Sequence, residues 1–258
     1  MSGWIIRWHC IYPGWIYSKP CKFFTGLKNE TFYMKKKDRL RADKLYQSLE
    51  SIAATRDGEE NTDDLASIQG QAVHMVADSS RLPRLKRFRF QLLHQWLIHN
   101  FAPCRAADIG GGKGLLSYLL IQSGWQATVI DPVAQRLPEK YKDIVTDTRR
   151  KVEPSARVPN LPLEFEIQHA QGFDLLIGMH AHGCNVKIIE AAAQAGCGFV
   201  LFPCCVIDEP FVPPPGVHWL ESLANYAVRQ GHAVKPFRLN FKGQNIGIYA
   251  MKEKRTGR

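Results

Sequence analysis

From Arg105 to the end of the chain, short apolar runs alternate with helical stretches, and this alternation limits the possible folds more than any other feature. Short links between alternating strands and helices are typical of a doubly wound α/β sheet with helices on both faces. Ligands of such sheets bind beyond the carboxyl ends of the strands. The predicted strands are RAADIG, ATVIDP, LEFEIQ (163–168), FDLLIGM, GFVLFPCCV and a final antiparallel pair, AVKPFRLN and IGIYAMKE.

These runs predict a seven-stranded sheet that is mostly parallel, with an antiparallel terminal strand. The helices expected between the strands differ in character. Three are apolar or amphipathic, and one, over 134–153, is strongly polar. They read GLLSYLLIQSG, which ends at Gly124, AQRLPEKYKDIVTDTRRKVE, VKIIEAAAQAG and HWLESLANYAVRQGH.

The sequence divides into three predicted regions. We expect residues 1–33 to be an irregular or over-extended N-terminal arm, because Met34 opens MKKKDRLRADK, which is typical of a protein start. Residues 34–100 are predicted to be helical, with helices over about 35–54, 65–77 and 85–101. Residues 101–258 form the predicted Rossmann-like α/β domain.

Composition favours an anionic partner and a reducing compartment. The 258 residues carry a net charge of +10, and a basic excess attracts polyanions such as nucleic acid. The seven cysteines include no CxxC pair, so we expect reduced thiols and a cytoplasmic location. No apolar run approaches the roughly 18–20 residues of a membrane span, so we expect no membrane partner.

Four glycines follow the first strand of the α/β region, in DIGGGKG (108–114). A phosphate-binding P-loop is excluded because Gly114 stands where that motif needs Ser or Thr. The dinucleotide pattern GxGxxG fits no frame fully. The frame that fits is DxGxGxG, with Asp108, Gly110, Gly112 and Gly114. Its glycines allow close approach of a ligand to the backbone, and its acid suits a ligand that carries an ammonium group.

A second acid, Asp131, ends the next strand about twenty residues later, where it can accept hydrogen bonds from ribose hydroxyls. Together with Asp108 and the glycines, this arrangement resembles the class I S-adenosylmethionine-dependent methyltransferases. The resemblance covers about residues 105–258. It implies the Rossmann-like methyltransferase fold, S-adenosylmethionine as the cofactor, and cofactor contacts at Asp108, Gly110, Gly112, Gly114 and Asp131.

Two later segments narrow the resemblance. IGMHAHGCN (177–185) and LFPCCVIDEP (201–210) are similar to the HxCG-like and CC elements of a group that includes tRNA 2′-O-methyltransferases. In that group's pattern His180 aligns with the histidine, and Cys204 and Cys205 with the cysteine pair. The chain has His182 where the group usually has Cys, and Val and Ile follow its cysteine pair in place of histidines.

The resemblance places four candidate catalytic residues after the fourth and fifth strands: His180, His182, Cys204 and Cys205. The histidines can act as a base or orient the acceptor, and at least one can instead be structural. A cysteine nucleophile, as in RNA cytosine-C5 methyltransferases, is an alternative, and so is simple packing of both thiols. A metal site that adds Cys184 to these residues is chemically possible, but its irregular spacing does not favour it, so we assign no metal.

Three basic clusters favour RNA as the predicted substrate. They occur over 35–44, 81–89 and 149–151. In the second, Arg87 and Arg89 alternate with Phe88 and Phe90, a pattern that could combine phosphate contact with base stacking. We therefore predict a methyltransferase that acts on RNA resembling tRNA. A small-molecule or protein acceptor and a non-catalytic binding module remain as alternatives.

Overall fold

The computed structural model describes residues 36–55, 88–241 and 243–251. The predicted arm over 1–33 and the helix expected over 65–77 lie outside the described residues. None of the described helices is long and apolar enough to cross a membrane.

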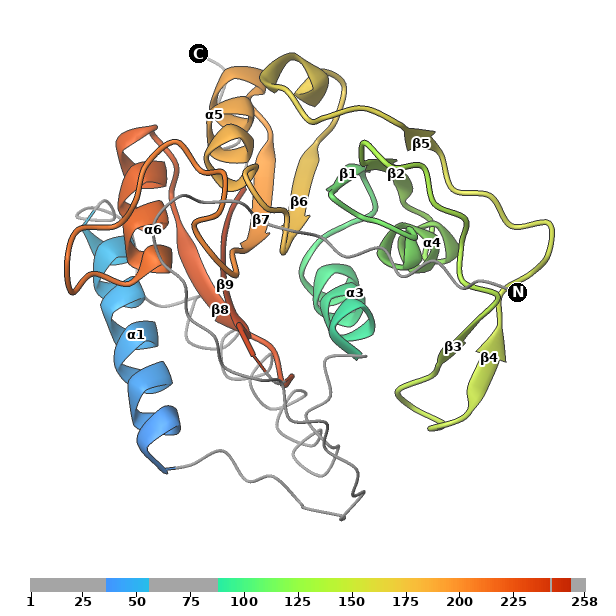
Figure 1. The fold of residues 1–258 in the computed structure, drawn as a ribbon, viewed down its shortest axis with the longest axis horizontal. Helices are drawn as coiled ribbons and strands as arrows, with labels where there is room; N and C mark the ends of the chain where they lie inside the picture. The colour runs from blue at the N-terminus through green and yellow to red at the C-terminus, as the bar shows by residue number, and fades with distance from the viewer. Residues whose placement is uncertain (1–35, 56–87, 242, 252–258) are drawn as a thin grey trace, which may run out of the picture. The chain divides into compact units, whose positions relative to one another are not determined.

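Seven strands form one sheet, as predicted (Figure 1). All neighbouring strands are parallel except β9, which runs antiparallel to β7 and to β8. The predicted mostly parallel sheet with an antiparallel terminal strand is therefore confirmed. In sheet order the strands are β5 (Asn160–Leu161), β2 (Gln126–Ile130), β1 (Arg105–Ile109), β6 (Leu175–Met179), β7 (Gly198–Phe202), β9 (Ile246–Ala250) and β8 (Lys235–Arg238).

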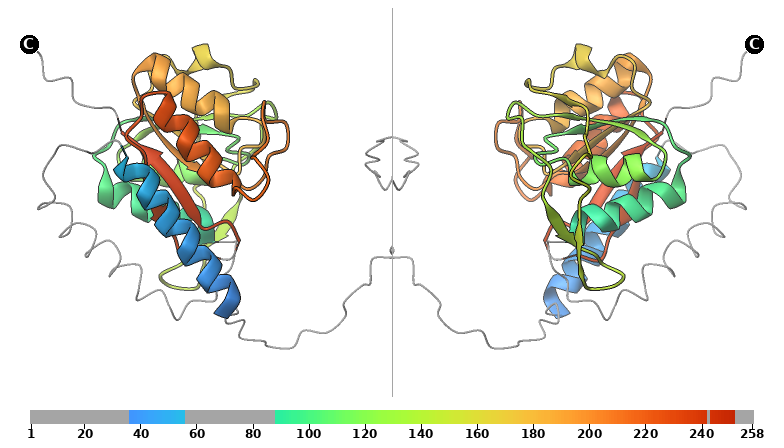
Figure 2. Two further views of the ribbon diagram at one scale, coloured as in Figure 1. Left: turned by 90° about the vertical axis from the view of Figure 1, so that its left-hand side faces the viewer. Right: turned by 90° about the vertical axis from the view of Figure 1, so that its right-hand side faces the viewer.

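Helices cover both faces of the sheet, and Figure 2 shows them on its two sides. One core cluster joins the sheet to α1 (Lys36–Ala54), α5 (Asn185–Ala195) and α6 (Trp219–Arg229). The other joins the opposite face to α3 (Arg89–Asn100) and α4 (Leu115–Gln122). Because both faces are covered, β6 and β7 are apolar without interruption rather than alternating with polar residues, and β1 is interrupted near its end by the buried Asp108.

Successive residues of one strand point to opposite faces of the sheet. In β6, Leu175 and Ile177 belong to the cluster with α3 and α4, and Leu176 belongs to the cluster with α1, α5 and α6. On α3, the Trp96 ring stacks on Phe237 of β8 with 3.9 Å between the ring centroids. This contact contributes to holding the first turn of α3 near the carboxyl ends of the central strands.

The polar helix predicted over 134–153 is wrong. The segment forms a hairpin of β3 (Lys140–Lys142) and β4 (Arg149–Lys151). The Asp143 carboxylate accepts hydrogen bonds from the backbone N–H groups of Val145 and Thr146, both at 2.9 Å. Such local bonding offers the backbone an alternative to a helix, and Pro138 also disfavours a helix interior.

The strand predicted over 163–168 is also displaced. The edge strand β5 lies just before it, and the predicted segment runs into a short 3₁₀ helix, Ile167–Ala170. Pro162 follows β5 directly and cannot donate a ladder hydrogen bond. Phe165 is buried in the core, so the apolar residues that suggested a strand pack as a loop instead.

Candidate active site

The glycine turn lies between the carboxyl end of β1 and the start of α4. Gly110, Gly112 and Gly114 have φ values of +65°, +54° and +71°, a region that favours glycine. Gly111 needs to be glycine for a different reason, since a Cβ there would lie 2.7 Å from the Asp108 carboxylate. The turn therefore presents backbone rather than side chains at the carboxyl edge of the sheet.

Asp131 connects this turn to the end of β2. Its Oδ2 accepts a hydrogen bond from Gly112 N–H at 2.9 Å, and its Oδ1 accepts one from Val133 N–H at 2.9 Å. Each carboxylate oxygen has a further lone pair. Asp131 can therefore order the glycine turn and still accept hydrogen bonds from a ligand.

Asp108 lies beneath the turn and is only 2% exposed. Its Oδ2 accepts a hydrogen bond from the Ser117 hydroxyl at 2.9 Å. Burial raises the pKa of the Asp108 carboxyl to about 6, although hydrogen bonds from Ser117 oppose that shift. Asp108 does not line the surface of the cavity described next; it packs behind the glycine turn that lines it.

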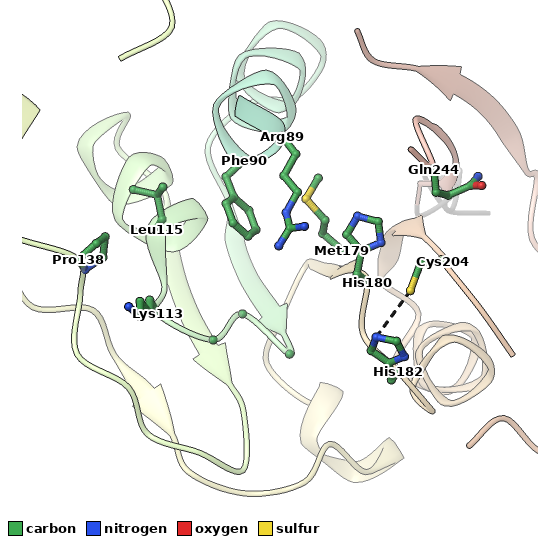
Figure 3. A pocket seen from close by; sticks show the side chains of 13 residues that line it. Arg89, Phe90, Lys113, Leu115, Pro138, Met179, His180, His182, Cys204 and Gln244 are labelled. Atoms are coloured by element: carbon green, nitrogen blue, oxygen red, sulfur yellow. Dashed lines mark hydrogen bonds between the residues drawn. The ribbon is translucent and has the colours of Figure 1, made fainter. Parts of the chain in front are cut away.

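A cavity of about 850 Å³ opens between the glycine turn and the ends of β6 and β7 (Figure 3). Of the predicted site residues, it brings together two glycines, both histidines and one cysteine. They are Gly110, Gly112, His180, His182 and Cys204. Gly114 lines a neighbouring hollow of about 970 Å³ that shares Gly112 and Lys113 with the first.

The loops after β6 and β7 place His182 against both adjacent thiols. His182 Nδ1 lies 3.0 Å from Cys205 Sγ, and its Nε2 lies 3.7 Å from Cys204 Sγ. The two sulfur atoms are 3.7 Å apart. His180, two residues earlier, has a left-handed backbone with φ +61°, which is uncommon outside glycine and can mark a functional position.

The Cys204 thiol is a poor nucleophile in this setting. The Cys204 side chain is exposed, yet partial desolvation, reinforced by the neighbouring Cys205, raises the pKa of the Cys204 thiol to about 11. Because the thiolate is the reactive form, this shift does not favour attack on a base. The raised pKa of its thiol therefore counts against Cys204 as the nucleophile.

Sequence reasoning did not assign α3 to the site, yet its first turn lines the cavity. Arg89 and Phe90 face the cavity, with the Arg89 guanidinium carbon 4.7 Å from the Phe90 ring centroid. Phe88 is 2% exposed and packs in the core, so it cannot stack on a base as the alternating pattern suggested. The basic, aromatic composition of this segment was a signal, but the sequence did not show which side chains point inward.

Other lining residues come from places without a motif. Met179 ends β6, Leu115 begins α4, and Gln244 precedes β9. Met179 and Leu115 are apolar residues of a kind found in any α/β core, and Gln244 belongs to no motif, so no sequence signal marks these three as site residues.

No family model matches the chain. Probable tRNA (uracil-O(2)-)-methyltransferases of Caenorhabditis elegans and Caenorhabditis briggsae are 34% and 33% identical to it over 103 residues. The match covers 40% of this chain and 17% of the length of each relative. The predicted resemblance to class I S-adenosylmethionine-dependent methyltransferases is confirmed.

Similar solved structures include methyltransferases. The S-adenosylmethionine-dependent methyltransferase SibL in its apo form is 14% identical, with a TM-score of 0.41, over 83% of this chain and 76% of that chain. Magnesium protoporphyrin IX methyltransferase from Synechocystis PCC 6803, with S-adenosylmethionine bound, is 11% identical, with a TM-score of 0.41, over 89% of this chain and 100% of that chain.

Proposed function

We propose that this chain is an S-adenosylmethionine-dependent methyltransferase that acts on RNA, with a tRNA-like acceptor. One observation carries the proposal. The glycine turn after β1 is hydrogen-bonded through Gly112 to Asp131 at the end of β2, and it forms one wall of a cavity. A ligand with an amino-acid end and a ribose suits this combination of bare backbone and two carboxylates.

The residues present fit the cofactor. Along the turn the wall of the cavity consists of Gly110, Gly111 and Gly112, which carry no side chains, and Lys113 and Leu115 line it beyond them. These glycines would hold the cofactor, with Asp131 accepting from its ribose and Asp108 providing negative charge behind the turn. When bound, S-adenosylmethionine supplies a methyl group on a positively charged sulfur.

The opposite wall would position the acceptor and manage its proton. His180 lines the cavity and can accept a proton from an attacking hydroxyl or amine, or orient it by a hydrogen bond. Arg89 faces the same space, and its buried Nε has no hydrogen-bond partner among the described residues. An anionic group of the acceptor, such as a phosphate, would satisfy this guanidinium.

The β3–β4 hairpin supports RNA as the acceptor. Lys140 lies opposite Lys151, and Lys142 lies opposite Arg149, so four basic residues share one face of the hairpin. Lys142 pairs with the Asp147 carboxylate, whereas Lys140 and Lys151 place like charges directly opposite each other, a repulsion that a polyanion would relieve. Lys140 and Lys151 also line the hollow next to the cavity. The curated relatives, whose names refer to tRNA methylation, agree with this proposal.

Two measurements test the proposal. Calorimetry with S-adenosylmethionine should show binding, and a Gly112→Val variant should abolish it, because a β-branched residue is strained in the left-handed backbone with φ +54° that the turn adopts. A labelled methyl group should then appear in the RNA fraction of a cell extract. Label only in protein or small molecules would refute the RNA acceptor, and binding without any transfer would favour a non-catalytic module.

A further inference from the structure

We infer that His182, Cys204 and Cys205 form a binding site for a zinc-type divalent cation at the wall of the cavity. Their candidate ligand atoms, one nitrogen and two sulfurs, lie within 4.8 Å of one another. The spacing in the sequence did not favour a metal, because 21 residues separate His182 from Cys204. The fold removes that objection, since β6 and β7 are adjacent parallel strands and their following loops meet at one edge of the sheet.

The distances suit tetrahedral coordination. With zinc–sulfur bonds of about 2.3 Å and zinc–nitrogen bonds of about 2.0–2.1 Å, tetrahedral geometry separates two sulfurs by roughly 3.8 Å and a sulfur from a nitrogen by roughly 3.6 Å. The Cys204 and Cys205 sulfurs are 3.7 Å apart. The Cys205 sulfur lies 3.0 Å from His182 Nδ1, and the Cys204 sulfur lies 3.7 Å from the other ring nitrogen, Nε2. The imidazole therefore faces both thiols, and the ring must reorient for one nitrogen to bind the cation together with both sulfurs.

Backbone contacts hold the two loops that carry these donors close to each other. Gly183 packs so closely on Asp208 that an added Cβ would lie 2.9 Å from the Asp208 Cβ. The Glu209 carboxylate accepts hydrogen bonds from the N–H groups of Asn185 and Val186 at 3.0 and 3.1 Å. The loop with the cysteines is therefore tied to the start of α5, directly after His182. Asp208 also has a left-handed φ of +60°, a conformation that persists only where the surroundings enforce it.

The donor set indicates which cation would bind. Two thiolates and one imidazole select zinc and other soft or borderline metals over magnesium or calcium, which prefer oxygen. Two cysteines with one histidine is a set that catalytic zinc sites use, and such sites leave the fourth position open. His182 and Cys204 are exposed and line the cavity, so a cation from solution can reach them.

A cation here would complement the proposed methyl transfer. This part rests on the proposed function: an acceptor oxygen in the fourth position would lose its proton more readily, since a bound cation lowers the pKa of a coordinated hydroxyl. His182 would then be a ligand and not the base, which leaves the proton transfer to His180.

Cobalt substitution tests the site without measuring activity. Reduced protein titrated with Co²⁺ should develop sulfur-to-cobalt charge-transfer absorption that saturates at one ion per chain, and Zn²⁺ should abolish it. Cys205→Ser and His182→Ala should weaken cobalt binding at least tenfold. Cys104→Ser should not weaken it, because that half-buried thiol lies at the amino end of β1, the end away from the cavity.

Calorimetry with S-adenosylmethionine on the same samples shows whether the cofactor site is intact, so the two proposals can fail separately. Absence of charge-transfer absorption, or absorption that all three variants retain, would overturn the metal site.

Discussion

Two walls of one cavity are built in different ways. The glycine wall, formed by Gly110, Gly111 and Gly112 and supported by Asp131, offers backbone and fixed hydrogen bonds. The histidine–cysteine wall, formed by His180, His182 and Cys204, offers side chains from two loops, and Cys205 contacts His182 beside it. The two walls therefore suit two different tasks. Backbone suits a ligand that is the same compound in every turnover, and loop side chains suit chemistry that differs between acceptors.

The largest difference between the two walls is expected for a substitution of His180, which lines the histidine–cysteine wall. We expect His180→Asn to lower turnover by about 10²-fold or more, because a general base or orienting group is lost. Asn tolerates the left-handed backbone that His180 adopts, so the loop should keep its shape. Steady-state methyl transfer measures the effect, and S-adenosylmethionine affinity should change by less than about twofold.

The control for this variant is His99→Asn, because His99 is exposed on α3 and does not line the cavity. It should retain full turnover. If His180→Asn also kept its turnover, the histidine–cysteine wall would not act through His180, and the division between the two walls would be wrong there.

For Gly111→Ala on the glycine wall, the main loss is expected in the affinity for S-adenosylmethionine. The new Cβ would lie 2.7 Å from the buried Asp108 carboxylate, so the turn must shift. Overpacking typically costs about 1–3 kcal/mol, and we expect cofactor affinity to fall by tenfold or more in calorimetry.

Gly124→Ala separates this steric effect from backbone strain. Gly124 has a φ of +84° with nothing within 4 Å of an added Cβ, and it lies at the far end of α4. We expect it to lower the melting temperature and leave cofactor affinity unchanged. Equal losses of affinity in both variants would mean that general destabilisation, and not the shape of the turn, controls binding.

The glycine wall was predictable from the sequence, and most of the other wall was not. Gly110, Gly112 and Gly114 signal their backbone conformation directly, because few other residues adopt it, and a strand end fixes where they lie. The contacts of His182 depend on two loops that meet only after β6 and β7 pair. Arg89 reaches the cavity because α3 packs on β8, a contact between residues that are far apart in the chain.

The errors in predicted elements have a similar origin. Segment 134–153 contains many residues that favour helices, yet the local hydrogen bonds of Asp143 and the ion pair between Asp143 and Arg150 favour a hairpin. The apolar central strands were predicted correctly because burial on both faces gives them a continuous apolar pattern.

The β3–β4 hairpin tests whether RNA approaches beside the glycine wall. We expect the double variant Lys140→Ala and Lys151→Ala to weaken RNA binding about tenfold and to reduce the slope of log affinity against log salt, because phosphate contacts are lost. The hairpin itself should be no less stable, since the two lysines repel each other across the strands.

Arg105→Ala is a single-charge control, because Arg105 is exposed at the amino end of β1, where its guanidinium pairs with the Asp174 carboxylate at 2.9 Å and does not line the cavity. Its RNA affinity and salt slope should equal those of the unaltered chain. An equal loss from Arg105→Ala would show that overall charge, and not the hairpin, attracts the RNA.

The smallest expected effect is the pH dependence of the cofactor affinity at the glycine wall. Burial raises the pKa of the Asp108 carboxyl to about 6, so this group is mostly ionised at pH 7.0 and mostly neutral at pH 5.5. The cofactor's ammonium group stays protonated over this range, so its attraction to Asp108 weakens as the pH falls. If only the ionised carboxyl favours binding, a pKa of about 6 gives an affinity roughly fourfold lower at pH 5.5 than at pH 7.0.

Calorimetry at the two pH values measures this, and Asp108→Asn should bind with the same affinity at both. Ser117→Ala should move the dependence to higher pH, because Ser117 donates a hydrogen bond that favours the ionised form. A flat profile in the unaltered chain would mean that Asp108 supports the turn without attracting the cofactor, and the glycine wall would then act through its shape alone.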